Sequence, residues 1–156
     1  MFTGDKSGDF LYQVLFETGF ASQPASQDRE DGLKLRDLYI TSAARCAPPD
    51  NRPSKEEFAN CRPFLERELR ALKNVRVVVA LGALALEAFL EVLKSRGEIE
   101  SRSAFRFVHG AEYTLPAMGL TVLTSYHPSQ QNTQTKRLTQ TMLRAIFSRA
   151  RFFAQS

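Results

Sequence analysis

Apolar and polar residues alternate along this chain with the periods expected of helices and buried strands. Apolar side chains in residues 9–18 recur every three or four positions, which predicts a first helix that Gly19 is placed to end. Ser54 is followed three positions later by Glu57, a capping box that predicts a second helix reaching about residue 73. The same spacing predicts two further helices, over residues 83–94 and 135–153.

Short apolar runs between these helices predict strands. Residues 75–81, with the sequence VRVVVAL, form a β-branched run typical of buried parallel strands, and residues 120–125 form a second apolar run. A shorter strand is predicted over residues 38–41, and edge strands over residues 105–108 and 113–115. Strands that alternate with helices indicate a three-layer α/β/α domain around a mostly parallel central sheet. We therefore expect one domain that covers residues 1–156.

Three polar segments follow predicted strands, at the places where such folds bind ligands. Ligands of parallel sheets bind beyond the carboxyl ends of the strands. Residues 42–53, the turn at Gly82 and residues 126–132 occupy these ends, so the fold predicts that they are neighbours. His127 and Asn132 are not typical of an apolar core, although a single histidine in a loop more often has no special role.

The net charge of +4 permits an anionic partner without requiring one. No acidic residue follows Glu112, so the C-terminal third is basic, which suits a polyanion. A solvated helix face explains the same charges and is the simpler interpretation. No apolar run reaches the ~18 residues of a membrane span, and residues 1–8 do not form a signal peptide. We expect a cytoplasmic protein without a membrane partner.

The chain contains two cysteines, Cys46 and Cys61. A disulfide is unexpected in a cytosolic protein. Two unrelated buried thiols are one interpretation, and half of a four-thiolate metal site, formed when the loop folds back on the next helix, is the other. A structural zinc site is a third hypothesis, but it needs two more ligands, and the chain has only His109 and His127 as histidines.

Three motifs in the same order along the whole chain carry a resemblance. They are Phe2-Thr3-Gly4-Asp5 followed by Ser7-Gly8-Asp9, Arg45-Cys46-Ala47-Pro48-Pro49-Asp50-Asn51-Arg52-Pro53 followed by Cys61-Arg62-Pro63, and His127-Pro128-Ser129-Gln130-Gln131-Asn132-Thr133 followed by Arg137-Leu138-Thr139. Together they resemble the iron–sulfur uracil-DNA glycosylases of the family-five type. Two shorter segments, Val79–Gly82 and Phe107–Gly110, also resemble that family.

The resemblance implies a base-excision repair enzyme that flips uracil, or another deaminated base, out of DNA and hydrolyses its bond to the sugar. His127 is then the donor to the uracil oxygen that gains charge, and Asp5 is a candidate for positioning the attacking water. Phe2 stacks on the flipped base, while Ser42 and Asn132 contact it. Ser42 stands where related enzymes often have an asparagine, so the resemblance implies looser selectivity for uracil.

The resemblance also implies a DNA surface and a cofactor. Contacts are expected from the loop that enters the minor groove and from cations that meet phosphates: Ser129, Gln130, Gln131, Arg45, Lys136 and Arg137. Cys46 and Cys61 match two of the four ligands of a 4Fe-4S cluster with a structural role. The expected protein is a monomer that binds DNA containing uracil or other deaminated bases.

In the family, an earlier segment supplies two more cysteines, the first core strand and a glycine-rich motif. We therefore expect that this chain lacks part of the N-terminal region and that its stability and activity are low. Apolar residues such as Val77, Val79 and Leu123 are then expected to be exposed. The alternative function is a DNA-binding remnant that no longer catalyses the reaction.

Overall fold

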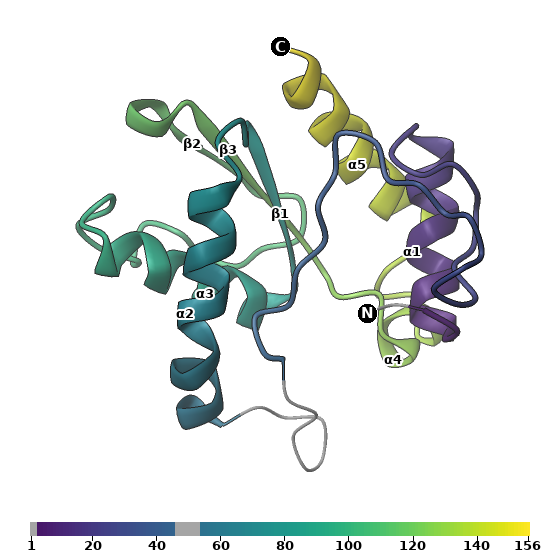
Figure 1. Ribbon diagram of the computed structural model, residues 1–156, viewed down its shortest axis with the longest axis horizontal. Coiled ribbons are helices and arrows are strands. Elements are labelled where there is room, and N and C mark those ends of the chain that lie inside the picture. The colour runs from purple at the N-terminus through teal and green to yellow at the C-terminus, as the bar shows by residue number, and fades with distance from the viewer. Residues whose placement is uncertain (1–2, 46–53) are drawn as a thin grey trace.

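A mixed three-stranded sheet separates two sets of helices in the computed structural model, which describes residues 3–45 and 54–156 (Figure 1). The strands are β1 (Val77–Leu81), β2 (Glu112–Leu115) and β3 (Leu120–Ser125), in the order β1-β3-β2. All six residues of β3 are buried, because this central strand is covered on both faces.

The sheet is only partly parallel. β1 and β3 pair in parallel, with Val79 opposite Leu123, whereas β2 and β3 pair antiparallel. The prediction of a mostly parallel sheet is therefore wrong for the part of the chain that the structure describes. The reason is local: a single 3-10 turn, Pro116–Met118, joins β2 to β3, and so short a connection can join only antiparallel neighbours.

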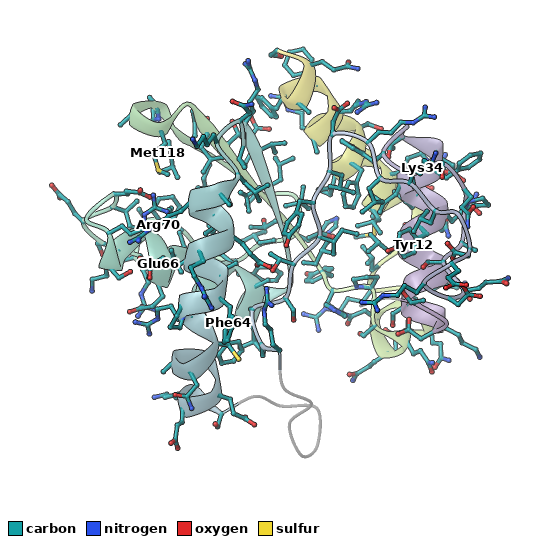
Figure 2. The ribbon with its side chains drawn as sticks, in the orientation of Figure 1. Tyr12, Lys34, Phe64, Glu66, Arg70 and Met118 are labelled. Atoms are coloured by element: carbon teal, nitrogen blue, oxygen red, sulfur yellow. The ribbon has the colours of Figure 1, made fainter. Side chains whose placement is uncertain are left out.

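Helices pack on the two faces of the sheet. On one face lie α1 (Lys6–Glu17) and α5 (Gln140–Gln155), side by side, and on the other lies α3 (Ala83–Ser95), against which α2 (Lys55–Ala71) packs (Figure 1). Figure 2 shows Tyr12, which is buried, on α1. In the described residues, each helix is too short or too polar to cross a membrane.

Alternate side chains of β3 feed two hydrophobic clusters. Leu123 belongs to the cluster formed with α1 and α5, and Val122 to the cluster formed with α3, because successive side chains of a strand point to opposite faces. The expected exposure of Leu123 is wrong, since that residue is only 2% exposed. Val77 and Val79 are partly buried against the α1–α5 cluster.

Side-chain caps begin the helices where the sequence places them. The predicted capping box of α2 is confirmed: the Ser54 hydroxyl accepts from the Glu57 N–H, and the Glu57 carboxylate accepts from the Ser54 N–H. Asp5 caps α1 and Thr139 caps α5 in the same manner. The starts of these helices are thus encoded in their own first turns.

Three predicted elements differ from the structure. The last helix begins at Gln140 instead of residue 135, and a short helix, α4 (Gln130–Gln134), precedes it. Lys136, which has a positive φ of 56°, lies between these two helices. Residues 38–41 and 105–108 form no strand, because side-chain contacts hold these extended segments instead of a hydrogen-bonded ladder.

Candidate active site

His127 lies in the loop that leaves the carboxyl end of β3. The residue is exposed, whereas Pro128 after it is buried and fixes the direction of the loop. Enough protein surrounds the ring that desolvation lowers the pKa of His127, while the nearby carboxylate of Asp5 opposes this effect. The net lowering means that the imidazole is neutral at neutral pH and offers one N–H donor.

The turn between β1 and α3 leaves room for this histidine. Gly82 has a φ of +102°, and its N–H donates to the Ser125 carbonyl at 2.8 Å. A Cβ atom added at Gly82 lies 3.5 Å from the Cβ of His127. Glycine therefore permits the unusual backbone conformation of this turn, while the added Cβ would make only an ordinary contact with His127.

The start of α1 lies within electrostatic reach of the same loop. Asp5 affects the pKa of His127, and one of its oxygens, Oδ1, accepts from the Gly8 N–H at 2.6 Å as the cap of α1. The structure thus brings Asp5 and His127 together, although 122 positions separate them. Phe2 lies outside the described residues.

Hydrogen bonds within the loop fix the backbone of His127. The Asn132 side-chain amide donates to the His127 carbonyl at 2.9 Å, and the Asn132 carbonyl accepts from the Leu138 N–H at 2.9 Å. Ser129 caps α4 by accepting from the Asn132 N–H. Asn132 is therefore placed to order the loop from inside.

A second histidine supports the residue before His127. The Tyr126 N–H donates to Nδ1 of His109 at 3.1 Å, and the two rings stack with centroids 5.0 Å apart. The Arg137 guanidinium lies 4.6 Å from the centroid of the Tyr126 ring. Sequence reasoning gave His109 no role in the site. The resemblance of the segment Phe107–Gly110 to the family was the sequence signal that could have indicated such a role.

Ser42 lines a separate pocket of about 460 Å³. Its hydroxyl donates to the Ala44 carbonyl at 2.6 Å, which leaves the oxygen lone pairs as acceptors. Arg45 binds Glu68 of α2 and lies over the Phe64 ring, with its guanidinium carbon 5.1 Å from the centroid. The structure therefore places Arg45 against α2.

The other expected DNA contacts surround α4. Gln130 and Gln131 are exposed, and so are Lys136 and Arg137, whose side chains follow this short helix. The helix α4 itself lies beside the N-terminal end of α1 (Figure 1). A polyanion that contacts the loop would therefore meet two cations there.

Cys61 is buried on α2, at 6% exposure, and its Sγ accepts from the Arg45 N–H at 3.4 Å. A buried sulfur that accepts a backbone N–H fits a thiolate ligand of an iron–sulfur cluster. Cys46 lies outside the described residues, and within residues 3–45 and 54–156 no three candidate metal ligands are grouped together. The donors of the described residues therefore fit one ligand position and do not build a complete site.

The fold and the site define the class of this protein. The family description of the uracil DNA glycosylase superfamily matches residues 1–151. The chain belongs to the uracil DNA glycosylase superfamily.

Within the superfamily, the chain is similar over nearly its whole length to type-5 uracil-DNA glycosylases. The Type-5 uracil-DNA glycosylase of Thermus thermophilus is 48% identical over 153 residues, which cover 98% of this chain and 67% of that protein. Those of Pyrobaculum aerophilum and Mycobacterium leprae are each 45% identical and are covered over 62% and 66% of their lengths. The chain thus spans about two thirds or less of these relatives.

Proposed function

We propose that this chain excises uracil from DNA by hydrolysing the N-glycosidic bond, as the names of its type-5 relatives describe for those proteins. The observation that carries the proposal is the loop after β3, where a neutral His127 is held by Asn132 and lies within electrostatic reach of Asp5. Other deaminated bases are further candidate substrates, because Ser42 offers fewer polar groups than an amide side chain.

His127 has the role of a hydrogen-bond donor to the leaving base. When the glycosidic bond breaks, the sugar becomes cation-like and the uracil ring takes up negative charge. A neutral imidazole carries one N–H, which it donates to the oxygen that gains this charge. The lowered pKa of His127 supports this role, since the neutral form then predominates at neutral pH.

Asp5, Phe2 and Ser42 complete the proposed site. One carboxylate oxygen of Asp5 caps α1, which leaves the other to orient the attacking water and to stabilise the cation-like sugar. The Ser42 hydroxyl donates its hydrogen bond to the Ala44 carbonyl, so the Ser42 oxygen remains an acceptor for an N–H of the base. Phe2 is assigned to stack on the flipped base.

The proposed DNA surface is the α4 region. Ser129, Gln130 and Gln131 enter the minor groove, and Lys136 and Arg137 meet phosphates, which gives affinity that decreases with salt. Arg45 contributes less than expected from the sequence, because Glu68 already binds its guanidinium. The same domain, residues 1–156, carries the whole surface.

We assign Cys61, together with Cys46, to two ligand positions of a 4Fe-4S cluster. When bound, the cluster supplies structural support to the segment before α2, and the hydrolysis requires no redox step. Four thiolates complete such a site, and this sequence contains two cysteines. No step of the proposed reaction therefore depends on the cluster.

The test is an excision assay on the 156-residue chain. A duplex with a single uracil is incubated with the wild type and with His127→Ala, and abasic sites are revealed by alkali. The expected result is strand cleavage that falls by roughly 100-fold or more in the variant, with no cleavage of a matched duplex that contains thymine. Thermal unfolding of both proteins controls for folding.

The same material tests the alternative of a DNA-binding remnant. The proposed activity for this chain would be contradicted if the wild type and His127→Ala both bind the uracil duplex and neither cleaves it. Cleavage that is equal in the wild type and the variant would remove His127 from the mechanism.

A further inference from the structure

One carboxylate on α2 binds three side chains of the segment that carries Ser42. Glu68 accepts a hydrogen bond from the Tyr39 hydroxyl at 2.8 Å, and it also binds the Thr41 hydroxyl and the Arg45 guanidinium. Its side chain is 18% exposed, so these donors replace much of the water that would otherwise surround it. These three partners stand at positions 39, 41 and 45 of the segment.

The backbone of this segment makes few other hydrogen bonds. In the described part of the chain, residues 38–42 belong to no strand, so no ladder of backbone hydrogen bonds holds them. The Arg45 N–H binds Cys61, which lies two helical turns before Glu68 and therefore on the same side of α2. Two residues of one face of α2 thus hold the segment, in addition to Leu38 and Ile40, which pack against the α1–α5 cluster.

The charge of Glu68 is suited to this role. Burial raises the pKa of Glu68, but the hydrogen bonds from Thr41, Tyr39 and Arg45 together outweigh it, so the pKa lies below its ordinary value. Accepting from Tyr39 in turn raises the pKa of that phenol. At neutral pH the carboxylate is therefore ionised and the phenol keeps its proton to donate.

We infer that Glu68 is a positioning residue: it holds residues 39–45 in the conformation in which Ser42 lines the pocket of about 460 Å³ and, in the proposed function, accepts from the base. The pocket is formed by this segment and Glu68 itself, so its shape depends on their contact. The catalytic consequence rests on the proposed glycosylase function, whereas the holding of the segment is a property of the chain alone.

Amide hydrogen exchange of Arg45 tests the holding directly, because its N–H is the bonded backbone N–H of this segment among the described contacts. The proteins are the wild type, Glu68→Ala, Glu68→Gln and, as a matched control, Glu66→Gln. Glu66 lies on the same helix and binds Arg70 at 2.8 Å instead of this segment (Figure 2). Exchange is expected to be about tenfold faster in Glu68→Ala. It is expected to be partly restored in Glu68→Gln, whose amide oxygen still accepts from the hydroxyls, and to be unchanged in Glu66→Gln.

Single-turnover excision and DNA affinity test the consequence. In Glu68→Ala, uracil excision is expected to fall by about 10- to 100-fold, because a displaced Ser42 no longer meets the base in a productive orientation. Affinity for a duplex without uracil is expected to be kept or to increase, because Arg45 is released from Glu68, whereas a general loss of structure would reduce it. Exchange in α5 is measured in the same samples as a control for the fold.

Equal exchange of the Arg45 amide in the wild type and Glu68→Ala would overturn the inference. Faster exchange combined with unchanged excision by an active wild type would overturn it as well, since the segment would then not shape the pocket. If the wild type does not excise uracil, the proposed function fails, and the exchange rates still decide whether Glu68 holds the segment.

Discussion

At the scale of single residues, His127 depends on three neighbours, two of which come from distant parts of the chain. Gly82 leaves space beside its Cβ atom, Asn132 binds its carbonyl, and Asp5 influences its charge. None of these contacts is a packing contact between large apolar side chains. Changes at these positions are therefore expected to affect the geometry and charge of the site more than the stability of the core.

The pH dependence of excision is predicted from the charge of His127. Desolvation holds the pKa of His127 below its ordinary value of about 6.5. If the neutral form is the donor, the rate is constant above that pKa and falls as the pH decreases through it. Because Asp5 raises the pKa of His127, Asp5→Asn is expected to shift the acid limb to lower pH.

Asparagine is also a good helix cap, so the Asp5→Asn variant removes the charge without removing the cap of α1. The measurement is the single-turnover rate between about pH 5 and 8 for the wild type and for the residual activity of Asp5→Asn. An acid limb that moves to higher pH in the variant would contradict the assigned interaction.

Gly82→Ala is predicted to damage both stability and activity. A φ of +102° is strained for any side chain, and the added Cβ meets His127. The expected loss in the free energy of unfolding is about 1–3 kcal/mol, measured by urea denaturation. Excision is expected to fall as well, because relief of this strain moves the turn that contacts His127.

Gly97→Ala is the matched control for this change. Gly97 also has a positive φ, of 71°, but no atom lies within 4 Å of its added Cβ. It should lose stability and keep its excision rate. Equal losses of activity in the two variants would show that strain, and not contact with His127, causes the effect.

At the scale of elements, local patterns predicted those helices and strands that carry their own signals. The strand at residues 120–125 and the capping box of α2 are confirmed, and of the strand predicted over residues 75–81 residues 77–81 form β1. Residues 38–41 looked like a strand because they form a short apolar run, but Tyr39 and Thr41 bind Glu68 instead. Strand formation depends on a partner strand, and a short apolar run does not identify one.

Part of the candidate site could not be predicted from the sequence, because its contacts also depend on partners that only the fold brings together. Glu68 resembles every other surface glutamate of a helix, and only the fold reveals that three donors converge on it. His109 likewise gains its role only through the Tyr126 N–H. By contrast, the loop at His127 was predicted, because its polar residues directly follow a buried strand.

The start of α2 provides a prediction at this scale. Ser54→Ala removes the acceptor for the Glu57 N–H and is expected to reduce the free energy of unfolding by about 1 kcal/mol. Glu57→Gln keeps an oxygen that accepts from the Ser54 N–H, so it should cost much less. Urea denaturation of both variants checks this, and equal losses would contradict a role for the reciprocal cap.

At the scale of the whole molecule, the basic C-terminal helix links parts of the fold. Arg144 pairs with Glu17, Arg149 with Glu112 and Arg151 with Asp37, over N–O distances of 2.7 to 3.0 Å. These acids come from α1, β2 and the loop after α1. The excess of cations after residue 112 is therefore in part complementary to acids elsewhere in the chain.

DNA binding is predicted to distinguish the cations of the α4 region from those of α5. Lys136→Gln and Arg137→Gln should each weaken binding to any duplex and reduce the salt slope by about one. Arg149→Gln is the control, since Glu112 binds its guanidinium twice, at 2.8 and 2.9 Å. Titrations at several salt concentrations provide the measurement, and an equal change in slope for Arg149→Gln would contradict the assignment.

The order of the sheet has a consequence for the protein in concentrated solution. Among the residues that the structure describes, β1 pairs with β3 alone, so one backbone edge of the uncharged run Val77–Leu81 has no ladder. Such edges promote strand addition between molecules and, over time, aggregation. Loss of native protein on heating is then governed by the rate of an irreversible step instead of an equilibrium, and it accelerates with protein concentration.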